Sequence, residues 1–469
     1  MFEVRGLRFD VKLMVKGFRN LERQTSNFKR AAAKVSFVSE EPIAAPCVII
    51  LILKTMRNSV FWWVLIGFMV LLDFYFFQAL KTITQTTSSK ARLIIFICYW
   101  AISISAVVLL LLLPYLNFEN KFFRNTLFAI IAGLFFAKLV ASAIFLVDDI
   151  RRGIQWLAGK VFFSNTEGEG YQAGERISRS VFLSWTGMLI GGGLFGSLVY
   201  GFGNKYRYQL RRIQMAFEKL PSSFKGLKVV QISDIHSGSF TDKHAVKKGV
   251  EKILKEKPDL ILFTGDLINN RSDEMNDFID IFKEVKAPMG VYSILGNHDY
   301  GDYTKWDSPE EKIANLDRLK QIHKELGWQL MLDENTQLER NGDKISLIGV
   351  QNISGKRGFH SYGDLAKAYQ GVDESHFKIL MSHDPSHWDS EVRKKYSSID
   401  LMLSGHTHGF QFGIEIPGFK WSPVQYVYKQ WAGHYIEDGQ QLYINRGFGF
   451  LAYPGRVGIL PEITVIELI

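Results

Sequence analysis

The stretch KVVQISDIH, residues 228–236, is a short apolar run that ends in two side chains able to bind a metal, Asp234 and His236. The same arrangement recurs four more times before residue 410, in DLILFTGD (259–266), GVYSILGNHD (290–299), FKILMSHDP (377–385) and DLMLSGHTH (400–408). A single Asp or His after a strand is often only a turn former or a helix cap. Five such strand ends in one region predict a shared site.

Helix signals occur between the earlier of these strands and are weak between the later ones. Asp242 is placed to cap one helix, and Ser308 followed by Pro309 is placed to open another. Strands that alternate with helices predict an α/β domain whose site lies at one edge of the sheet. The later apolar runs are not cleanly separated by helices: 344–350, 441–447 and 463–468. They favour a sandwich of two sheets over one doubly wound sheet.

The polar groups at the strand ends form a mixed oxygen and nitrogen ligand set. Asp, Asn and His without Cys suit Mn, Fe, Zn or Ni and differ from the all-oxygen cages of Ca. Seven potential ligands exceed what one ion needs when positions stay open for water and substrate. Two divalent ions that share a carboxylate can hold a bridging hydroxide and clamp a phosphoryl group for in-line attack.

The order DIH, GDLIN, GNHD, SHDP and GHTH resembles the signature of the calcineurin-like metallophosphoesterases over about residues 224–469. The late NRGFG, PGR and PEITVIEL segments are similar to those of bacterial membrane-anchored members. The resemblance implies a four-layer β-sandwich flanked by helices, with two divalent ions at the sheet edge. It also implies that the chain is an enzyme, a metal-dependent phosphoric ester hydrolase.

Matched position by position, the resemblance assigns the metal ligands to two ions. The first ion would be held by Asp234, His236 and His408, the second by Asn297, His383 and His406, and Asp266 would bridge them.

The same match assigns the groups around the ions. His298 would protonate the leaving-group oxygen or stabilise the phosphoryl transition state, and Asp299 would orient it and raise its basicity. Asn269 is expected to support the ligands without binding an ion. Phe410 stands where close relatives commonly have a glycine, which alters the wall beside the metals.

Before residue 204 the chain is built differently, with four apolar stretches of the length that crosses a bilayer. They lie at about 60–80, 93–116, 127–147 and 181–203. The last is rich in glycine, which suits close helix packing in lipid. The sequence therefore predicts an integral membrane protein in which an all-α module, residues 56–204, precedes a linker at 205–223 and the α/β domain at 224–469.

Two charges interrupt the membrane stretches, Asp73 in the first and Lys138 in the third. An unpaired charge near the bilayer centre is expensive, so we expect the two to pair. The alternative is that each snorkels or faces a polar crevice alone.

Residues 1–55 are basic and end in an apolar stub too short to span, so they read either as an extension upstream of a start at Met56 or as a surface-lying basic segment.

The net charge of +9 is explained by Lys and Arg beside membrane segments, and a nucleic-acid partner is not expected. The connections 81–92 and 148–180 hold eight Lys or Arg and 117–126 holds two, which favours an extracytoplasmic α/β domain. Basic residues directly after the fourth stretch argue the opposite way.

The only cysteines, Cys47 and Cys98, exclude a thiolate site from the α/β domain.

Together these features predict a membrane-anchored dinuclear phosphoesterase that attacks a phosphomonoester, phosphodiester or pyrophosphate with a metal-bridging hydroxide. Because the site would lie near headgroups, a lipid-linked substrate is expected. Segments 353–363 and 418–431 read equally as a phosphate-attracting rim or as ordinary loops. The alternatives are a membrane protein that binds metal or phosphate without turnover, and a nuclease or nucleotide phosphodiesterase. The sequence makes no prediction of oligomeric state.

Overall fold

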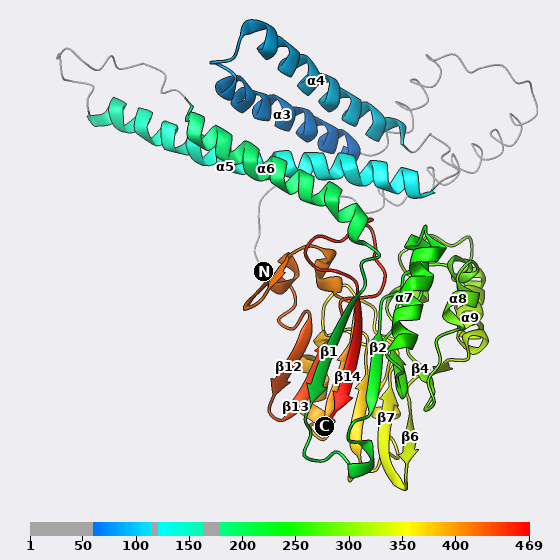
Figure 1. The fold of residues 1–469 in the computed structure, drawn as a ribbon. Helices are drawn as coiled ribbons and strands as arrows, with labels where there is room; N and C mark the ends of the chain where they lie inside the picture. The colour runs from blue at the N-terminus through cyan, green and yellow to red at the C-terminus, as the bar shows by residue number, and fades with distance from the viewer. Residues whose placement is uncertain (1–59, 114–120, 163–178) are drawn as a thin grey trace, which may run out of the picture. The chain divides into compact units, whose positions relative to one another are not determined.

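The computed structural model describes residues 60–113, 121–162 and 179–469 (Figure 1). The extension predicted for residues 1–55 lies outside the described residues. So does the end of the second predicted span, at 114–116. Residues 68–469 form one compact unit.

The part of the chain that the structure describes contains four helices long and apolar enough to cross a membrane. They are α3 (Val60–Ile83), α4 (Ser89–Leu112), α5 (Lys121–Phe162) and α6 (Val181–Gly201). All four predicted spans are therefore helical over their described residues. The glycine-rich stretch packs as expected, since a Cβ on Gly191 would lie 2.8 Å from the carbonyl oxygen of Ala137 on α5.

Helix α5 is much longer than the predicted span, which ended near residue 147. Its charged continuation stays helical because Arg151 Nη2 lies 2.7 Å from Asp148 Oδ1 one turn earlier, and Arg152 pairs with Asp149 in the same way. The amide of Ser180, the N-cap of α6, donates to Asp148 at 2.8 Å. Residues 148–162, read from the sequence as part of a connection, thus extend the helix and hold the start of α6.

The charges inside the membrane helices pair, as predicted. Lys138 Nζ lies 2.5 Å from Asp73 Oδ1 and 2.7 Å from Ser103 Oγ, and all three side chains are buried. The hydroxyl of Tyr99 donates to the carbonyl oxygen of Asp73 at 2.8 Å. These contacts join α3, α4 and α5 through a cluster in which each charge has a partner.

Reversing either charge alone, by Asp73→Lys or Lys138→Asp, is expected to lower the free energy of unfolding by at least about 3 kcal/mol. Each change leaves a buried charge without its counterion. The swapped double variant restores the pair and should recover part of the loss. Thermal unfolding in detergent measures all four proteins, and a double variant no more stable than either single one would show that the pair contributes nothing.

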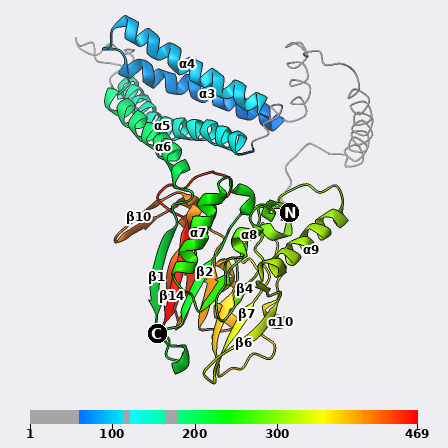
Figure 2. The same cartoon turned by 45° about the vertical axis from the view of Figure 1, so that its right-hand side comes forward.

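The rest of the chain builds two six-stranded mixed sheets (Figures 1 and 2). The first contains, in spatial order, β1 (Gln209–Met215), β14 (Glu462–Leu468), β2 (Lys228–Ile232), β3 (Leu260–Phe263), β4 (Val291–Ser293) and β5 (Gln329–Leu330). The second contains β12 (Gly433–Glu437), β13 (Gln440–Ile444), β9 (Leu401–Ser404), β8 (Phe377–Met381), β7 (Asp343–Gly349) and β6 (Glu334–Arg340). A small hairpin is formed by β10 (Ile414–Ile416) and β11 (Phe419–Trp421).

Alternation along the strands divides the apolar side chains among three cores. Val229 of β2 and Ile379 of β8 point into the core between the sheets. Their neighbours Val230 and Leu380 point outward, to cores covered by helices. These helices are α7 (Lys243–Lys255), α8 (Ile279–Phe282) and α9 (Pro309–Leu326) on the first sheet and α10 (Leu365–Ala368) on the second. The predicted four-layer sandwich is confirmed.

The helix caps also agree with the sequence, because Asp242 and Ser308 accept hydrogen bonds from the first turns of α7 and α9. Several strands were not predicted, and one of them, β1, lies within residues 205–223, which we predicted to be a linker. Strand β1, QLRRIQM, is polar and lies at the edge of its sheet, where it pairs in parallel with β14. An edge strand needs no continuous apolar pattern, so its strand character depends on the partner that it meets.

Candidate metal centre

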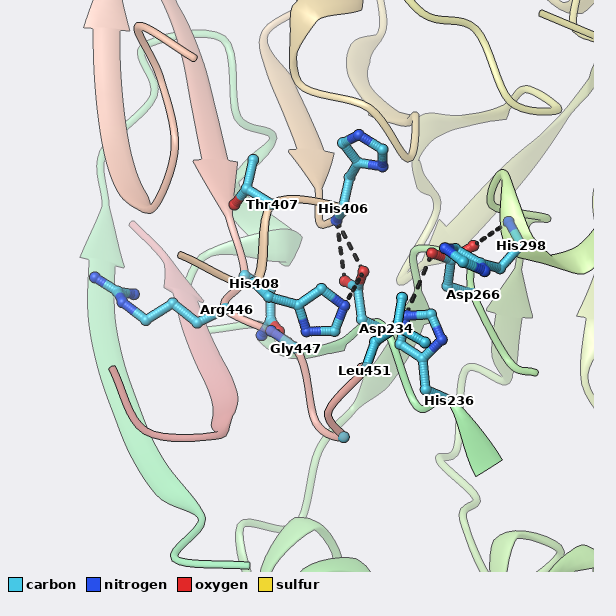
Figure 3. A network of polar contacts seen from close by, with 12 residues as sticks. Asp234, His236, Asp266, His298, His406, Thr407, His408, Arg446, Gly447 and Leu451 are labelled. Carbon is cyan, nitrogen blue, oxygen red and sulfur yellow. Dashed lines mark hydrogen bonds and ion pairs between the residues drawn. The ribbon is translucent and has the colours of Figure 1, made fainter. Parts of the chain in front are cut away.

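The polar residues that follow the strands come together where the two sheets end. Strands β2, β3 and β4 are parallel neighbours in one sheet, and β8 and β9 are parallel neighbours in the other. Their carboxyl ends therefore meet along one edge. Figure 3 shows part of the resulting cluster, in which the backbone amide of His406 lies 3.0 Å from both carboxylate oxygens of Asp234. This contact joins the second sheet to the first.

One part of the cluster contains Asp234, His236 and His408, all buried, with ligand atoms within 4.8 Å of one another. Nε2 of His408 lies 3.2 Å from Asp234 Oδ1. Both ring nitrogens of His236 are buried, and no group among the described residues forms a hydrogen bond with either. By contrast His387, equally buried, has Ser382 Oγ at 2.9 Å from one nitrogen and Glu391 Oε2 at 3.2 Å from the other. Burial of an imidazole without partners is costly, and a bound metal ion would remove the cost.

The other part contains Asp266, Asn297, His383 and His406. Oδ1 of Asn297 lies 3.1 Å from Nε2 of His383 and 2.8 Å from Nδ1 of His406. Oδ2 of Asp266 lies 3.1 Å from Nε2 of His383 and 3.5 Å from Nε2 of His236. Asp266 thus stands between the two parts. All seven predicted ligands are brought together, and five of them, Asp234, His236, Asp266, His383 and His408, form groups whose oxygen and nitrogen atoms could hold a divalent cation.

Five of these residues adopt backbone conformations that side-chain-bearing residues rarely take. Their φ angles are positive at Asp234 (52°), His236 (49°), Asp266 (62°), His406 (71°) and His408 (51°). Such strain persists only where the surroundings impose it, and it gathers at functional sites.

Gly405 allows the close approach of the two sheets at this point. A Cβ on Gly405 would lie 1.9 Å from Ser233 Oγ and 2.2 Å from Asp234 Oδ2. Its own φ is not in the left-handed region, so the absence of a side chain is required here by packing. Gly409, on the other side of the histidine pair, has a φ of 54°, in the left-handed region that favours glycine.

The surroundings of His236 and His383 shift their pKa values in opposite directions. Burial lowers the pKa of His236 well below its ordinary value, which leaves the neutral ring that binds metals. Burial also acts to lower the pKa of His383, but the carboxylates of Asp266 and Asp234 outweigh it and raise that pKa to about 10. Although burial raises the pKa of Asp266, the neighbouring histidines hold it well below its usual value. The carboxylates of Asp266 and Asp234 therefore favour a positive charge beside them.

His298 is oriented differently from expectation. Its Nδ1 lies 2.8 Å from the backbone carbonyl oxygen of Asn269, which fixes the proton on Nδ1 and leaves Nε2 able to face a substrate. The carboxylate of Asp299 accepts hydrogen bonds from backbone amides: those of Asp266, Leu267, Ile268 and Gly296. The orientation expected from Asp299 is thus supplied by Asn269, and Asp299 instead shapes the loop that carries Asp266.

Two tyrosines contact the predicted site residues and were not identified from the sequence. The hydroxyl of Tyr428 lies 2.9 Å from Nε2 of His406, and the Asn297 amide donates to the hydroxyl of Tyr303 at 2.9 Å. The ring of Tyr303 also lies 4.5 Å from that of His298. Tyr428 falls inside the aromatic segment 418–431 that we read as a rim or a loop, so a signal existed for one of the two.

Adding Mn²⁺ to metal-free protein at about a hundred times its dissociation constant is expected to raise the free energy of unfolding by about 2.7 kcal/mol. The ion would bind the folded arrangement of His236 and Asp234 and would have no such site in the unfolded chain. Thermal unfolding with and without the ion measures the shift. Asp234→Asn should reduce it, and an undiminished shift in that variant would place the ion elsewhere.

Comparison with known proteins gives two family matches. Residues 56–204 match the model described as "Probable Calcineurin-like phosphoesterase, transmembrane domain", and residues 227–410 match the one described as "Calcineurin-like phosphoesterase". The first covers the helices α3 to α6, and the second covers all five strand-end motifs.

Three curated relatives illustrate the similarity. "Uncharacterized metallophosphoesterase YkuE" of Bacillus subtilis is 29% identical over 303 residues, which cover 63% of this chain and 98% of the relative. "Transmembrane protein with metallophosphoesterase domain" of Danio rerio is 27% identical, over 55% of this chain and 56% of its own length. "UDP-2,3-diacylglucosamine pyrophosphatase LpxG" of Chlamydia muridarum is 26% identical, over 51% of this chain and 83% of its own length.

Proposed function

Because this chain belongs to the calcineurin-like metallophosphoesterases and carries their four-helix membrane domain, we propose that it is a membrane-anchored hydrolase that cleaves a phosphoric ester or pyrophosphate bond with two divalent ions. The observation that carries the proposal is the buried ring of His236, which has no hydrogen-bonding partner in the described part of the chain and lies among six further ligand candidates. A structural histidine in this place would have hydrogen-bonding partners, as His387 does.

Asp234, His236 and His408 would hold one ion, Asn297, His383 and His406 the other, and Asp266 would contact both. Bound there, the ions supply Lewis acidity to the phosphoryl oxygens and a nucleophile from water. They are proposed to be Mn, Fe, Zn or Ni because the donor set mixes oxygen with imidazole nitrogen.

The chain's own residues would do the rest. His298, with its proton fixed on Nδ1 by the Asn269 carbonyl, presents Nε2 to the substrate. When protonated at Nε2 it can donate to the leaving-group oxygen as the P–O bond breaks. Tyr303 packs against this ring and restricts its rotation. Tyr428 holds the ring of His406 in place from the opposite side of the ligand set.

The proposed substrate is lipid-linked. The chain is a membrane protein, and the Chlamydia relative is named for a pyrophosphatase that acts on a diacylated sugar nucleotide.

From the distribution of Lys and Arg between the connections, we place the catalytic domain on the extracytoplasmic face. Labelling of a Lys305→Cys variant in intact cells with a membrane-impermeant thiol reagent tests this placement, because Lys305 is exposed. Protection from the reagent until the cells are opened would reverse it.

The assay uses the full chain in detergent, stripped of metal and then supplied with Mn²⁺. Three soluble or micellar substrates distinguish the bond type: p-nitrophenyl phosphate, bis(p-nitrophenyl) phosphate and UDP-2,3-diacylglucosamine. We expect turnover of at least one, lost on stripping and restored by the ion. A His244→Ala variant, altered at an exposed histidine outside the cluster, is the matched control. No metal-dependent turnover of any of them would contradict the proposal.

A further inference from the structure

The hairpin β10–β11 has two chemically different faces. Its register pairs Ile414 with Trp421, Glu415 with Lys420 and Ile416 with Phe419. Because side chains alternate across a strand, the middle pair lies on one face and the two apolar pairs on the other. Figure 2 shows the hairpin extending away from the two large sheets.

The polar face is the one directed at the protein. Glu415 accepts hydrogen bonds from Arg446 at 2.7 Å and from Arg211 at 2.6 Å. Lys420 donates to the carbonyl oxygen of Ala432. The apolar face is left outward, with Ile416 58% exposed and Phe419 52% exposed. A hairpin on a water-facing surface normally has the reverse arrangement.

The exposed apolar residues are concentrated around this hairpin. Residues 205–469 expose eleven large hydrophobic side chains, and six of them lie within 410–427. These six are Phe410, Ile414, Ile416, Phe419, Tyr426 and Val427, which we call the hairpin surface. Single exposed hydrophobic residues are ordinary, whereas a contiguous group marks an interaction site. Phe410 is exposed although its φ of 58° is unfavourable for a residue with a side chain.

Hydrogen bonds connect the base of the hairpin to the end of the last membrane helix. The amide of Arg456 donates to the carbonyl oxygen of Gly201, the last residue of α6, at 2.9 Å. The next residue, Val457, donates to Gln411 at 2.8 Å and accepts from Gly413 at 2.9 Å, directly before β10. Packing is close here, since a Cβ on Gly201 would lie 2.6 Å from Val457 Cγ2. The hairpin is thus connected to the membrane helix α6 through the neighbouring residues Arg456 and Val457.

We propose that the hairpin surface inserts into the interfacial layer of the same bilayer that α3 to α6 cross. Aliphatic and aromatic side chains on an outward face, with Trp421 and Tyr426 beside them, match the chemistry of the headgroup and acyl boundary. Insertion covers Ile416 and Phe419 without a protein partner.

Docking would also present the metal centre to lipid headgroups. Phe410 follows His408 by two residues, and Val427 directly precedes Tyr428, whose hydroxyl contacts His406. The site is therefore adjacent to the inserted residues. This consequence for the substrate rests on the proposed hydrolase function, whereas docking itself does not.

Depth-dependent quenching tests the docking with the full chain in phosphatidylcholine and phosphatidylglycerol vesicles. In a Cys47→Ser, Cys98→Ser background, Ile416→Cys carries an environment-sensitive fluorophore, and Ile469→Cys at the far end of β14 is the matched control. We expect the label at 416 to shift its emission to the blue and to be quenched by spin-labelled lipid, and the label at 469 to do neither. Equal behaviour at both positions would overturn the proposal. Cross-linking of two copies through position 416 without lipid quenching would overturn it in favour of a subunit interface.

A second variant separates docking from chemistry. Ile416→Ser with Phe419→Ser should lower the rate on a vesicle-embedded lipid phosphoester by about tenfold, because two apolar side chains no longer favour insertion. Its rate on soluble bis(p-nitrophenyl) phosphate should stay that of the parent. Ile313→Ser with Ile469→Ser, two exposed residues outside the hairpin surface, is the control. Loss on both substrates would contradict a docking role. If the parent turns over neither substrate, the proposed function fails and the quenching result alone decides docking.

Discussion

Replacing Asp266 by asparagine is expected to lower kcat for phosphoester hydrolysis by roughly three orders of magnitude, the loss typical when one group that stabilises charge in the transition state is removed. Oδ2 of Asp266 lies within 3.5 Å of ring nitrogens from both parts of the ligand cluster, His383 and His236. An amide has the same shape but lacks the negative charge that two cations would share. Initial rates at saturating Mn²⁺ measure the effect.

Two further measurements decide why the rate falls. His244→Ala should keep the parental rate, because this histidine is exposed and lies outside the cluster. Metal content of Asp266→Asn should fall below that of the parent when both are counted after gel filtration. Parental activity in Asp266→Asn would rule out a bridging role for this carboxylate.

Replacing His298 by alanine is expected to slow hydrolysis by about a thousandfold when the leaving group is a poor one, such as an alkoxide. The proton that Nε2 would donate is then most needed. With p-nitrophenolate, which leaves without protonation, the loss should be much smaller. Paired rates on methyl and p-nitrophenyl esters of the same phosphate measure the difference.

The control for His298 lies beside it. Tyr303→Phe removes the hydroxyl that accepts from Asn297 but keeps the ring that packs on His298, so its rates should change equally for both leaving groups. If His298→Ala slows both esters by the same factor, the residue stabilises the phosphoryl group and does not act as an acid.

The convergence of the seven candidate ligands could be predicted from sequence because the information that brings them together is local. Each ligand follows an apolar run of strand length, and parallel strands place their carboxyl ends at a common edge whatever the details of packing. The pairing of Asp73 with Lys138 was one of two readings that the sequence left open, and it was favoured because an unpaired charge in lipid is costly.

Other features depend on contacts between distant segments. The hydrogen bond from His298 to Asn269 uses a backbone carbonyl, which has no signature in sequence, so the role expected of Asp299 was misassigned. Tyr303 and Tyr428 reach the site only because their loops fold over it. The length of α5 was underestimated because its charged end is stabilised by pairs such as Asp148 with Arg151.

The sequence by itself determined the membrane helices, the α/β sandwich and the seven residues that converge at the sheet edge. These follow from hydrophobic period and strand-end chemistry, which are properties of short segments. Only the tertiary structure decided which atom orients His298, and that the apolar face of the hairpin at Ile416 and Phe419 points outward. The direction of that face is set by Arg211 of β1 and Arg446, which follows β13, because both hold Glu415 against the domain. A two-residue period in the sequence indicates that a strand has two faces, but which face is buried depends on the residues that contact it in the folded chain.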